Sequence, residues 1–196
     1  EILRCLVGSE MCIRDSQYTE VGNFVVIYSA VGADEETIPT DNTQYNIAET
    51  SIIKIPNQEP KKLGYTFEGW KTGTDDTVYK YGTQNDTYTV PNDISGAITF
   101  IAQWSINEYK ITYELNGGIN AENAPVSYTI ETDTITLPVP TKDGYNFEGW
   151  YTDAAFENAV AAIAKGSVGD MVLYAKWSEK DMAVYKINSY LSLIHI

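Results

Sequence analysis

A seven-residue motif occurs twice in this chain, eighty residues apart, and constrains the fold more than any other feature of the sequence. Gly64 to Trp70 reads Gly-Tyr-Thr-Phe-Glu-Gly-Trp, and Gly144 to Trp150 reads Gly-Tyr-Asn-Phe-Glu-Gly-Trp. Each copy is followed by a second aromatic segment, at Ile98 to Trp104 and at Met171 to Trp177. Self-similarity at a fixed period is typical of repeat arrays, so the chain is predicted to contain tandem copies of one small domain.

The repeats set the expected domain boundaries. The first repeat is predicted to span residues 17–106 and the second residues 107–180. After Trp177 the chain reaches Val184-Tyr185-Lys186-Ile187, which is similar to Tyr109-Lys110-Ile111. Residues 181–190 are therefore interpreted as the start of a truncated third repeat.

Both ends of the chain are interpreted as translated sequencing-adapter sequence. Met11 to Ser16 and Leu191 to Ile196 can be encoded by DNA strings that are reverse complements of each other. We therefore exclude residues 1–16 and 191–196 from the reasoning about the fold. Both cysteines, the histidine and both arginines fall inside these ends, so residues 17–190 contain none of these three residue types.

This composition argues against several classes of function. The chain has 27 acidic against 13 basic residues, whereas nucleic acids and anionic membrane surfaces attract basic patches. No apolar run is long enough for membrane insertion. Without histidine, cysteine or arginine, the usual general base, thiol nucleophile and anion clamp are missing. The sequence therefore predicts no enzyme, no cofactor and no nucleic-acid partner.

The carboxylates that could suggest catalysis or metal binding are interpreted as surface charges. Glu68 and Glu148 occupy the same position in separate repeats, so they cannot form the paired carboxylates of a glycosidase and are expected to face solvent. Asp75-Asp76 and Asp133 show no spacing typical of a calcium loop, so they are interpreted as solvated loop charge.

Strand signals dominate the second repeat. Tyr109 to Leu115 alternates apolar and polar residues, and Asn116-Gly117-Gly118 then predicts a turn. The alanine-rich segment Ala154 to Ala164 is the one candidate for a helix, of one to three turns. The further predicted strands are Val126 to Ile130, Thr134 to Leu137 as a continuation or a separate strand, Tyr145 to Tyr151, and Met171 to Trp177.

The first repeat follows the same plan with different loops. Phe24 to Tyr28 is predicted to be its first strand and Tyr45 to Ile55 its second. Thr72 to Pro91 is polar and rich in turn residues, and it replaces the alanine-rich segment of the second repeat. Because loop length varies most easily at the surface, this segment is expected to be a surface loop.

The glycines of the motif predict a β-bulge. Phe147 and Trp150 are three residues apart, so they would point to opposite faces of a regular strand. A bulge at Gly149, and at Gly69 in the first repeat, would bring the two aromatic residues onto one face. Core packing is then the expected role of the tryptophans, with an exposed sugar-stacking platform as the alternative. These tryptophans are Trp70, Trp104, Trp150 and Trp177.

The order of these motifs closely resembles the Listeria–Bacteroides repeat, also called the internalin-type B repeat. The second repeat carries the full pattern, with Asn116-Gly117-Gly118, the Pro-x-x-x-Gly-Tyr-x-Phe-x-Gly-Trp segment Pro140 to Trp150, and Leu173 to Trp177. The first repeat keeps the central segment, Pro60 to Trp70, but has Ala30-Val31-Gly32 in place of Asn-Gly-Gly. The resemblance covers about residues 22–178.

The resemblance implies a β-rich α+β fold of two small β-grasp-like repeats, each a mostly antiparallel sheet with a short helix or loop insertion. It implies a spacer or adhesion module of a bacterial cell-surface or secreted protein, with neighbouring repeats and a surface protein or glycan as possible partners. A carbohydrate- or peptide-binding module beside a catalytic domain is the alternative. The structural motif residues are Gly64, Tyr65, Phe67, Gly69, Trp70 and Trp104, then Gly144, Tyr145, Phe147, Gly149, Trp150, Tyr174 and Trp177.

Overall fold

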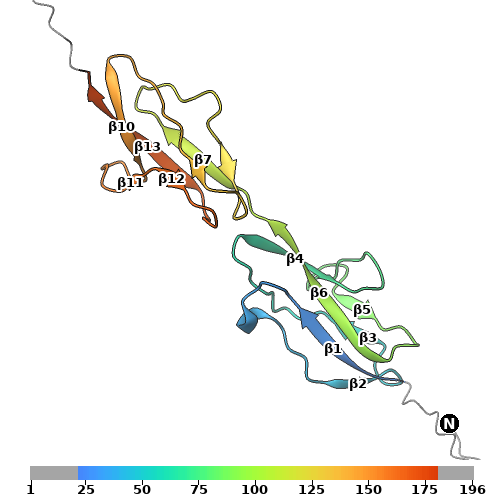
Figure 1. Ribbon diagram of the computed structural model, residues 1–196. Coiled ribbons are helices and arrows are strands. Elements are labelled where there is room, and N and C mark those ends of the chain that lie inside the picture. Colours follow the sequence, from blue (N-terminus) through green and yellow to red (C-terminus); the bar gives the residue numbers. More distant parts are fainter. Residues whose placement is uncertain (1–21, 181–196) are drawn as a thin grey trace, which may run out of the picture. The chain divides into compact units, whose positions relative to one another are not determined.

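The computed structural model describes residues 22–180, which form two compact units that divide between Ile106 and Asn107 (Figure 1). We call residues 22–106 unit 1 and residues 107–180 unit 2. The adapter-derived ends (1–16 and 191–196) and the third repeat (181–190) that the sequence predicts lie outside the described residues. Within residues 22–180 the secondary structure is almost entirely β-strand, with a single 3-10 helix, η1, at Glu35–Thr37.

Unit 1 has six strands: β1 (Asn23–Ser29), β2 (Gln44–Asn46), β3 (Ile52–Lys54), β4 (Tyr65–Lys71), β5 (Thr87–Thr89) and β6 (Gly96–Ile106). Four of them form a sheet in the order β2-β1-β6-β4. The central pair, β1 and β6, is parallel, and each outer strand is antiparallel to its neighbour. β3 and β5 form a separate antiparallel pair.

Unit 2 repeats this plan with β7 (Tyr109–Glu114), β8 (Ser127–Tyr128), β9 (Ile135–Thr136), β10 (Tyr145–Tyr151), β11 (Ala159–Val160), β12 (Ala162–Ile163) and β13 (Met171–Glu179). Its sheet has the order β11-β10-β13-β7-β8, and again the central pair, β13 and β7, is parallel. β9 and β12 pair separately, as β3 and β5 do in unit 1. The two units therefore share one topology around the repeated motif strands β4 and β10.

Each unit encloses its own apolar core. In unit 1 the buried apolar residues are Phe24, Val26, Ala30, Ile53, Ile55, Phe67, Trp70, Tyr88, Val90, Ile98, Phe100 and Ala102. In unit 2 they are Ile111, Tyr128, Leu137, Trp150, Ile163, Leu173 and Ala175. These residues alternate along the strands, because successive side chains of a strand point to opposite faces of the sheet.

The β-bulge predicted from the motif glycines is present in both units. Opposite β6, Phe67 pairs with Trp104 and Gly69 pairs with Gln103, so Glu68 is an extra residue in β4. The same shift between Phe147 and Gly149 makes Glu148 the extra residue of β10.

The bulge turns both motif aromatics inward. Gly69 and Gly149 have φ angles of 140° and 143°, a region that favours glycine. Trp70 is 0% exposed and Trp150 3% exposed, and each ring packs edge-on against the phenylalanine before the bulge. Core packing of these two tryptophans is therefore the correct interpretation.

The two buried tryptophans differ in one hydrogen bond, which yields a testable difference. The Trp150 Nε1–H donates to the Pro138 carbonyl at 2.7 Å, whereas the Trp70 Nε1–H has no acceptor among the described residues. Trp150→Phe should therefore cost about 1–2 kcal/mol more than Trp70→Phe, because it also leaves a buried acceptor unpaired. Denaturant unfolding followed separately for each unit by NMR measures both costs. Equal costs would mean that Trp70 has an equivalent acceptor.

The prediction of a helix at Ala154 to Ala164 is wrong. The second half of this segment contains β11 and β12, which pair with β10 and β9, and the first half forms turns. Pairing gives the backbone partners across the sheet and buries Ile163, which is 2% exposed. Isolated helices of this length are marginal in water, so long-range pairing outweighs the helix propensity of alanine.

Three strand predictions were too long. Tyr45 to Ile55 is not one strand, because Glu49 and Thr50 donate their N–H groups to the Asn46 carbonyl in a turn that separates β2 from β3. Val126 to Ile130 and Thr134 to Leu137 contain only the short strands β8 and β9. Between them, the Thr132 N–H donates to the Thr129 carbonyl in a further turn.

The prediction that Thr72 to Pro91 is a surface loop is wrong for its second half. Tyr88 and Val90 are each 3% exposed and belong to the core of unit 1. β5 lies in this segment and carries the Tyr88 ring to 5.4 Å from the Phe100 ring. The residues around Tyr88 are polar, so the sequence gives no strand signal there. The structure shows the strand through its pairing with β3.

Candidate functional site

A lysine lies over aromatic rings of the repeated motif in both units. Lys62 Nζ is 4.0 Å from the centroid of the Tyr65 ring and 5.8 Å from that of Trp104. Lys142 Nζ is 4.2 Å from Tyr145 and 5.8 Å from Trp177. We call these groups the lysine–aromatic clusters. A cation over an exposed aromatic face contributes about 0.5–1 kcal/mol, so each cluster stabilises its own unit.

Sequence reasoning missed the two lysines. A signal was present, because lysine stands two residues before the glycine of the Gly-Tyr pair in both repeats, as Lys62 and Lys142. Long charged side chains at a surface are usually solvated, which is why spacing alone did not single them out.

In unit 2 the three sequence signatures meet at this cluster. Asn116 Nδ2 donates to the Ala175 carbonyl at 3.0 Å, and Trp177 Nε1 donates to the Leu115 carbonyl at 2.9 Å. Lys142 Nζ donates to the Asn116 carbonyl at 2.7 Å. These three hydrogen bonds, each from a side chain to a backbone carbonyl, connect the Asn-Gly-Gly turn with the segment before the motif strand and with the final strand. The three sequence signatures of the second repeat thus share one structural role in unit 2.

Gly118 completes this junction by leaving room for an indole ring. A Cβ atom at Gly118 would lie 2.5 Å from Trp177 Cζ2, closer than real contacts allow. In the structure Val31-Gly32-Ala33, rather than Ala30-Val31-Gly32, takes the place of Asn116-Gly117-Gly118 in unit 1. The Ala33 N–H donates to the Ala30 carbonyl at 3.0 Å, and the Lys62 side chain comes within 3.5 Å of the position of a Cβ at Gly32.

The remaining motif residues are divided between turns, core and the opposite face of the sheet. Gly64 and Gly144 both have φ 78° in the turn that enters the motif strand. Leu173 and Ala175 point into the core of unit 2, so Tyr174 between them faces the other side. In unit 1, Gly64, Tyr65 and Phe67 line one surface groove, and Gly69, Trp70 and Trp104 are not among its lining residues.

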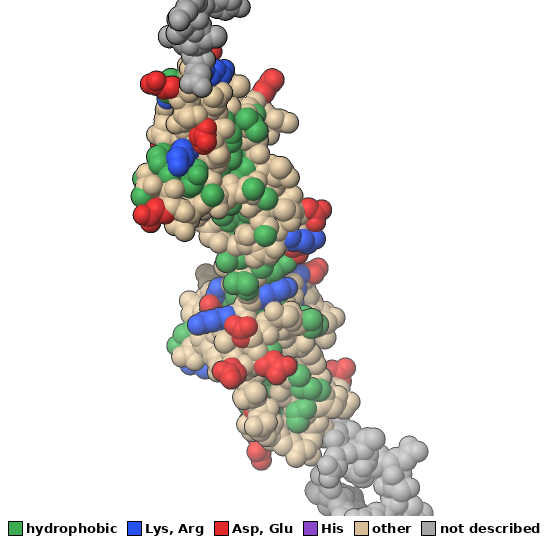
Figure 2. All heavy atoms as spheres, turned by 60° about the vertical axis from the view of Figure 1, so that its left-hand side comes forward, with side chains coloured by type: hydrophobic (Ala, Val, Ile, Leu, Met, Phe, Trp, Pro, Cys, Tyr) green, Lys and Arg blue, Asp and Glu red, His purple; other side chains and the backbone are tan. Residues whose placement is uncertain are grey.

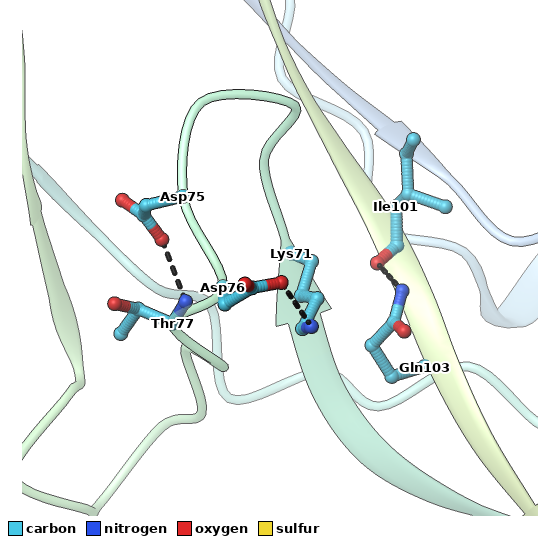
Figure 3. Close-up of polar contacts among 6 residues, drawn as sticks. All are labelled: Lys71, Asp75, Asp76, Thr77, Ile101 and Gln103. Atoms are coloured by element: carbon cyan, nitrogen blue, oxygen red, sulfur yellow. Dashed lines mark hydrogen bonds and ion pairs between the residues drawn. The ribbon is translucent and has the colours of Figure 1, made fainter.

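Figure 3 shows polar contacts at the end of β4, in the loop that follows it and in the neighbouring strand β6. Lys71 Nζ and Asp76 Oδ1 form an ion pair at 3.2 Å, and Asp75 accepts the Thr77 N–H at 2.7 Å. Burial alone would raise the pKa of Asp75, but hydrogen bonds from Thr77 and Tyr79 outweigh it and lower the pKa. Gln103 Nε2 donates to the Ile101 carbonyl of β6.

At the corresponding place unit 2 presents aromatic rings. The Tyr151 and Phe156 rings meet edge to face at 5.5 Å, and Lys176 Nζ lies 5.1 Å from the Tyr151 ring centroid. We call these three residues the aromatic corner. Phe156 has φ 58°, which is uncommon for a bulky residue and costs about 1–3 kcal/mol.

The turn that carries Phe156 is held by one carboxylate. Asp153 accepts hydrogen bonds from the N–H groups of Glu157 and Asn158, at 3.1 and 2.8 Å, and from Asn158 Nδ2. The backbone bonds from Glu157 and Asn158 lower the pKa of Asp153. Asp153 therefore stays charged and fixes the unusual backbone of the aromatic corner.

The carboxylates considered as reactive or metal-binding groups have local partners. Ser105 and Ser178 donate their hydroxyls to the exposed Glu68 and Glu148, one pair in each unit. Asp133 forms an ion pair with Lys165 at 2.9 Å. Within residues 22–180, no three histidine, cysteine or acidic side chains gather as metal ligands would.

Unit 1 has a surface groove of about 490 Å³ beside its lysine–aromatic cluster. Lys61, Lys62, Asp34 and Glu59 supply charges of both signs to its wall, and Phe67 contributes an aromatic surface. Glu59 also pairs with Lys80 at 3.4 Å. The groove is therefore close to charge balance.

On the face shown in Figure 2, acidic and basic side chains are scattered over each unit among apolar and uncharged ones, and no basic patch is visible. Over residues 22–180, no helix has both the length and the apolar character needed to cross a membrane.

The shared topology and the repeated lysine–aromatic cluster define a tandem β-repeat protein. The chain belongs to the Listeria-Bacteroides repeat domain family, whose model matches residues 24–103 and 109–176. The resemblance seen in the sequence is thereby confirmed.

Longer bacterial proteins contain related segments. A protein described as a Gly-rich membrane protein of Evansella cellulosilytica is 34% identical over 152 residues, which cover 74% of this chain and 17% of that protein. Internalin H of Listeria monocytogenes is 33% identical over 144 residues, which cover 71% of this chain and 24% of Internalin H. The chain thus spans less than a quarter of the length of either relative.

Proposed function

We propose that the two repeats form a non-catalytic spacer or stalk of a bacterial cell-surface or secreted protein. The observation that carries this proposal is the use of the recurring residues. Trp70 and Trp150 fill cores, Gly69 and Gly149 form bulges, and Lys142 with its aromatic partners fastens a turn. Residues that recur because each unit must hold itself together suit a structural repeat.

The net charge of the chain and its similarity to known proteins also support a role as a spacer. A net charge of −14 keeps such repeats soluble and mutually repelling. The relatives include Internalin H and a protein described as a membrane protein, so we propose a cell-surface or extracellular location. The proposal includes no cofactor and no nucleic-acid partner, with neighbouring repeats as the main contacts.

We also propose that each unit is β-grasp-like in topology. The strand orders β2-β1-β6-β4 and β10-β13-β7-β8, each with a parallel central pair, support this assignment. In unit 2 the strand pair β9·β12 includes part of the segment where a helix was expected, and in unit 1 the pair β3·β5 includes part of the segment expected to be a surface loop. A crystal structure of unit 2 tests the assignment by its strand order.

Independent folding is a requirement of this proposal. Residues 107–180 contain a complete core, so they should fold alone, with a stability of about 3–5 kcal/mol as expected for so small a domain. Urea unfolding of this fragment, compared with the two-unit chain, measures it. The absence of a cooperative transition in the fragment would instead indicate units that stabilise each other.

A binding screen tests the spacer function directly. We expect the chain to bind no member of an array of glycans and matrix proteins, and its melting temperature to be unchanged by calcium or a chelator. Dose-dependent binding to one array member would count against a pure spacer.

The alternative function, a carbohydrate-binding module, is favoured by one observation, the aromatic corner at Tyr151, Phe156 and Lys176. Sugar rings stack on aromatic side chains, and this group lies outside the core. Phe156→Gly removes the ring and relieves the positive φ, so it should abolish glycan binding without loss of folding. Leu63→Gly, at an exposed apolar residue of unit 1, is the control.

A further inference from the structure

Asn116-Gly117 is the one Asn-Gly pair in the chain, and it lies at a turn fixed by several bonds. Asn116 and Gly117 have φ angles of 51° and 85°, as in a type I′ turn. The turn is closed by the bond from the Gly118 N–H to the Leu115 carbonyl, at 2.9 Å. The Asn116 side chain is held across the sheet by the bond from Nδ2 to Ala175.

Asn-Gly pairs are chemically labile. The Gly117 nitrogen can bond to Asn116 Cγ and lose its proton, while the Cγ–Nδ2 bond breaks and Nδ2 leaves as ammonia. Water then opens the resulting five-membered imide at either carbonyl and gives aspartate or isoaspartate. Glycine permits this attack because it has no Cβ to obstruct it.

We propose that Asn116 is a deamidation site that the fold of unit 2 protects, so that its modification records unfolding of this unit. Asn116 is exposed to solvent, and access of water is therefore not the barrier. The barrier is geometric. Ring closure must break the hydrogen bond from Asn116 Nδ2 to the Ala175 carbonyl. The imide ring also contains the Cα–C bond of Asn116, so it fixes the ψ angle of Asn116 outside the left-handed region that the turn requires.

Modification also prevents full recovery of the native turn. Aspartate at position 116 places a carboxylate oxygen where the amide donated to Ala175, so two acceptors face each other. Isoaspartate lengthens the backbone inside the turn. Unit 1 has Val31-Gly32 where unit 2 has Asn116-Gly117, so it carries no equivalent site.

The test compares the full chain at mildly alkaline pH, folded in buffer and unfolded in urea. Peptide mapping by mass spectrometry measures the conversion of Asn116. We expect conversion to be slower in the folded chain by about a hundredfold or more, and to follow the unfolded fraction at intermediate urea, because only the open form reacts. Equal rates in both states, or no conversion at Asn116 in the unfolded chain, would overturn the proposal.

Two variants complete the test. Asn116→Gly keeps a residue that tolerates positive φ and has no amide to lose, so no mass change should map to position 116. Asn116→Asp reproduces one product directly. Its unit 2 should show faster amide hydrogen exchange than the original, with unit 1 unchanged, and unaltered exchange in unit 2 would contradict the proposed consequence.

Discussion

Truncating Trp150 to alanine is expected to unfold unit 2 and leave unit 1 folded. Trp150 is a buried member of the core of unit 2. Its ring packs against Phe147 and Tyr113, at 5.4 and 5.2 Å between ring centroids, and its Nε1–H donates to the Pro138 carbonyl. Loss of such a side chain costs about 3–5 kcal/mol, which equals the whole stability expected for a domain of this size. Amide hydrogen exchange of the full chain, assigned to each unit by peptide, measures the effect.

Tyr174→Ala is the matched control, because Tyr174 lies on the opposite face of the same sheet, in β13. Its truncation removes an aromatic ring outside the core and should cost about 1 kcal/mol. If Trp150→Ala left exchange in unit 2 slow, the core would not depend on this residue. If exchange became fast in both units together, the units would not be independent.

Gly69→Ala is expected to destabilise unit 1 more than Gly149→Ala destabilises unit 2. Both glycines have a positive φ that strains any other residue, at a cost of about 1–3 kcal/mol. At Gly69 a new Cβ would also lie 2.6 Å from Val78 Cγ1 and 2.8 Å from the Tyr79 carbonyl oxygen. At Gly149 its nearest neighbour would be Tyr151 Cε2, at an ordinary 3.8 Å.

The difference in destabilisation between the two variants measures how closely residues 78–80 approach the bulge at Gly69. In unit 1, Trp70 and Tyr79 exchange backbone hydrogen bonds at 2.8 and 2.7 Å, which presses residues 78–80 against Gly69. Overpacking there should add about 1–3 kcal/mol to the backbone strain. Urea midpoints of the two units, followed by NMR, give both costs. A cost at Gly149 equal to or above that at Gly69 would refute the close approach.

Local pattern predicted the strands that carry strong signals. Tyr145 to Tyr151 was predicted with the bounds that β10 has, and Phe24 to Tyr28 lies within β1. The bulges followed from the three-residue spacing of two aromatics around a glycine. In these cases the residues that indicate the strand or bulge are the same residues that form it, so tertiary contacts reinforce the local preference.

Signals that depend on a distant partner were missed. The residues around Tyr88 do not indicate that its strand, β5, pairs with β3. The residues around Lys142 do not indicate that its ammonium group lies over the ring of Trp177, thirty-five residues later. The alanine-rich segment was misassigned for the same reason, since propensity is a local quantity and its pairing with β9 and β10 is not.

The family, the tandem arrangement and the bulged motif strand were predictable from the amino-acid sequence alone, because the motif that indicates them occurs in both repeats. Three features became known only from the folded structure: which aromatic residues are buried and which form the aromatic corner, where the lysines lie, and the strand pairing that replaces the expected helix of unit 2. The physical reason is that burial and strand pairing are set by residues far apart in the chain, brought together when each unit closes its sheet around a parallel central pair.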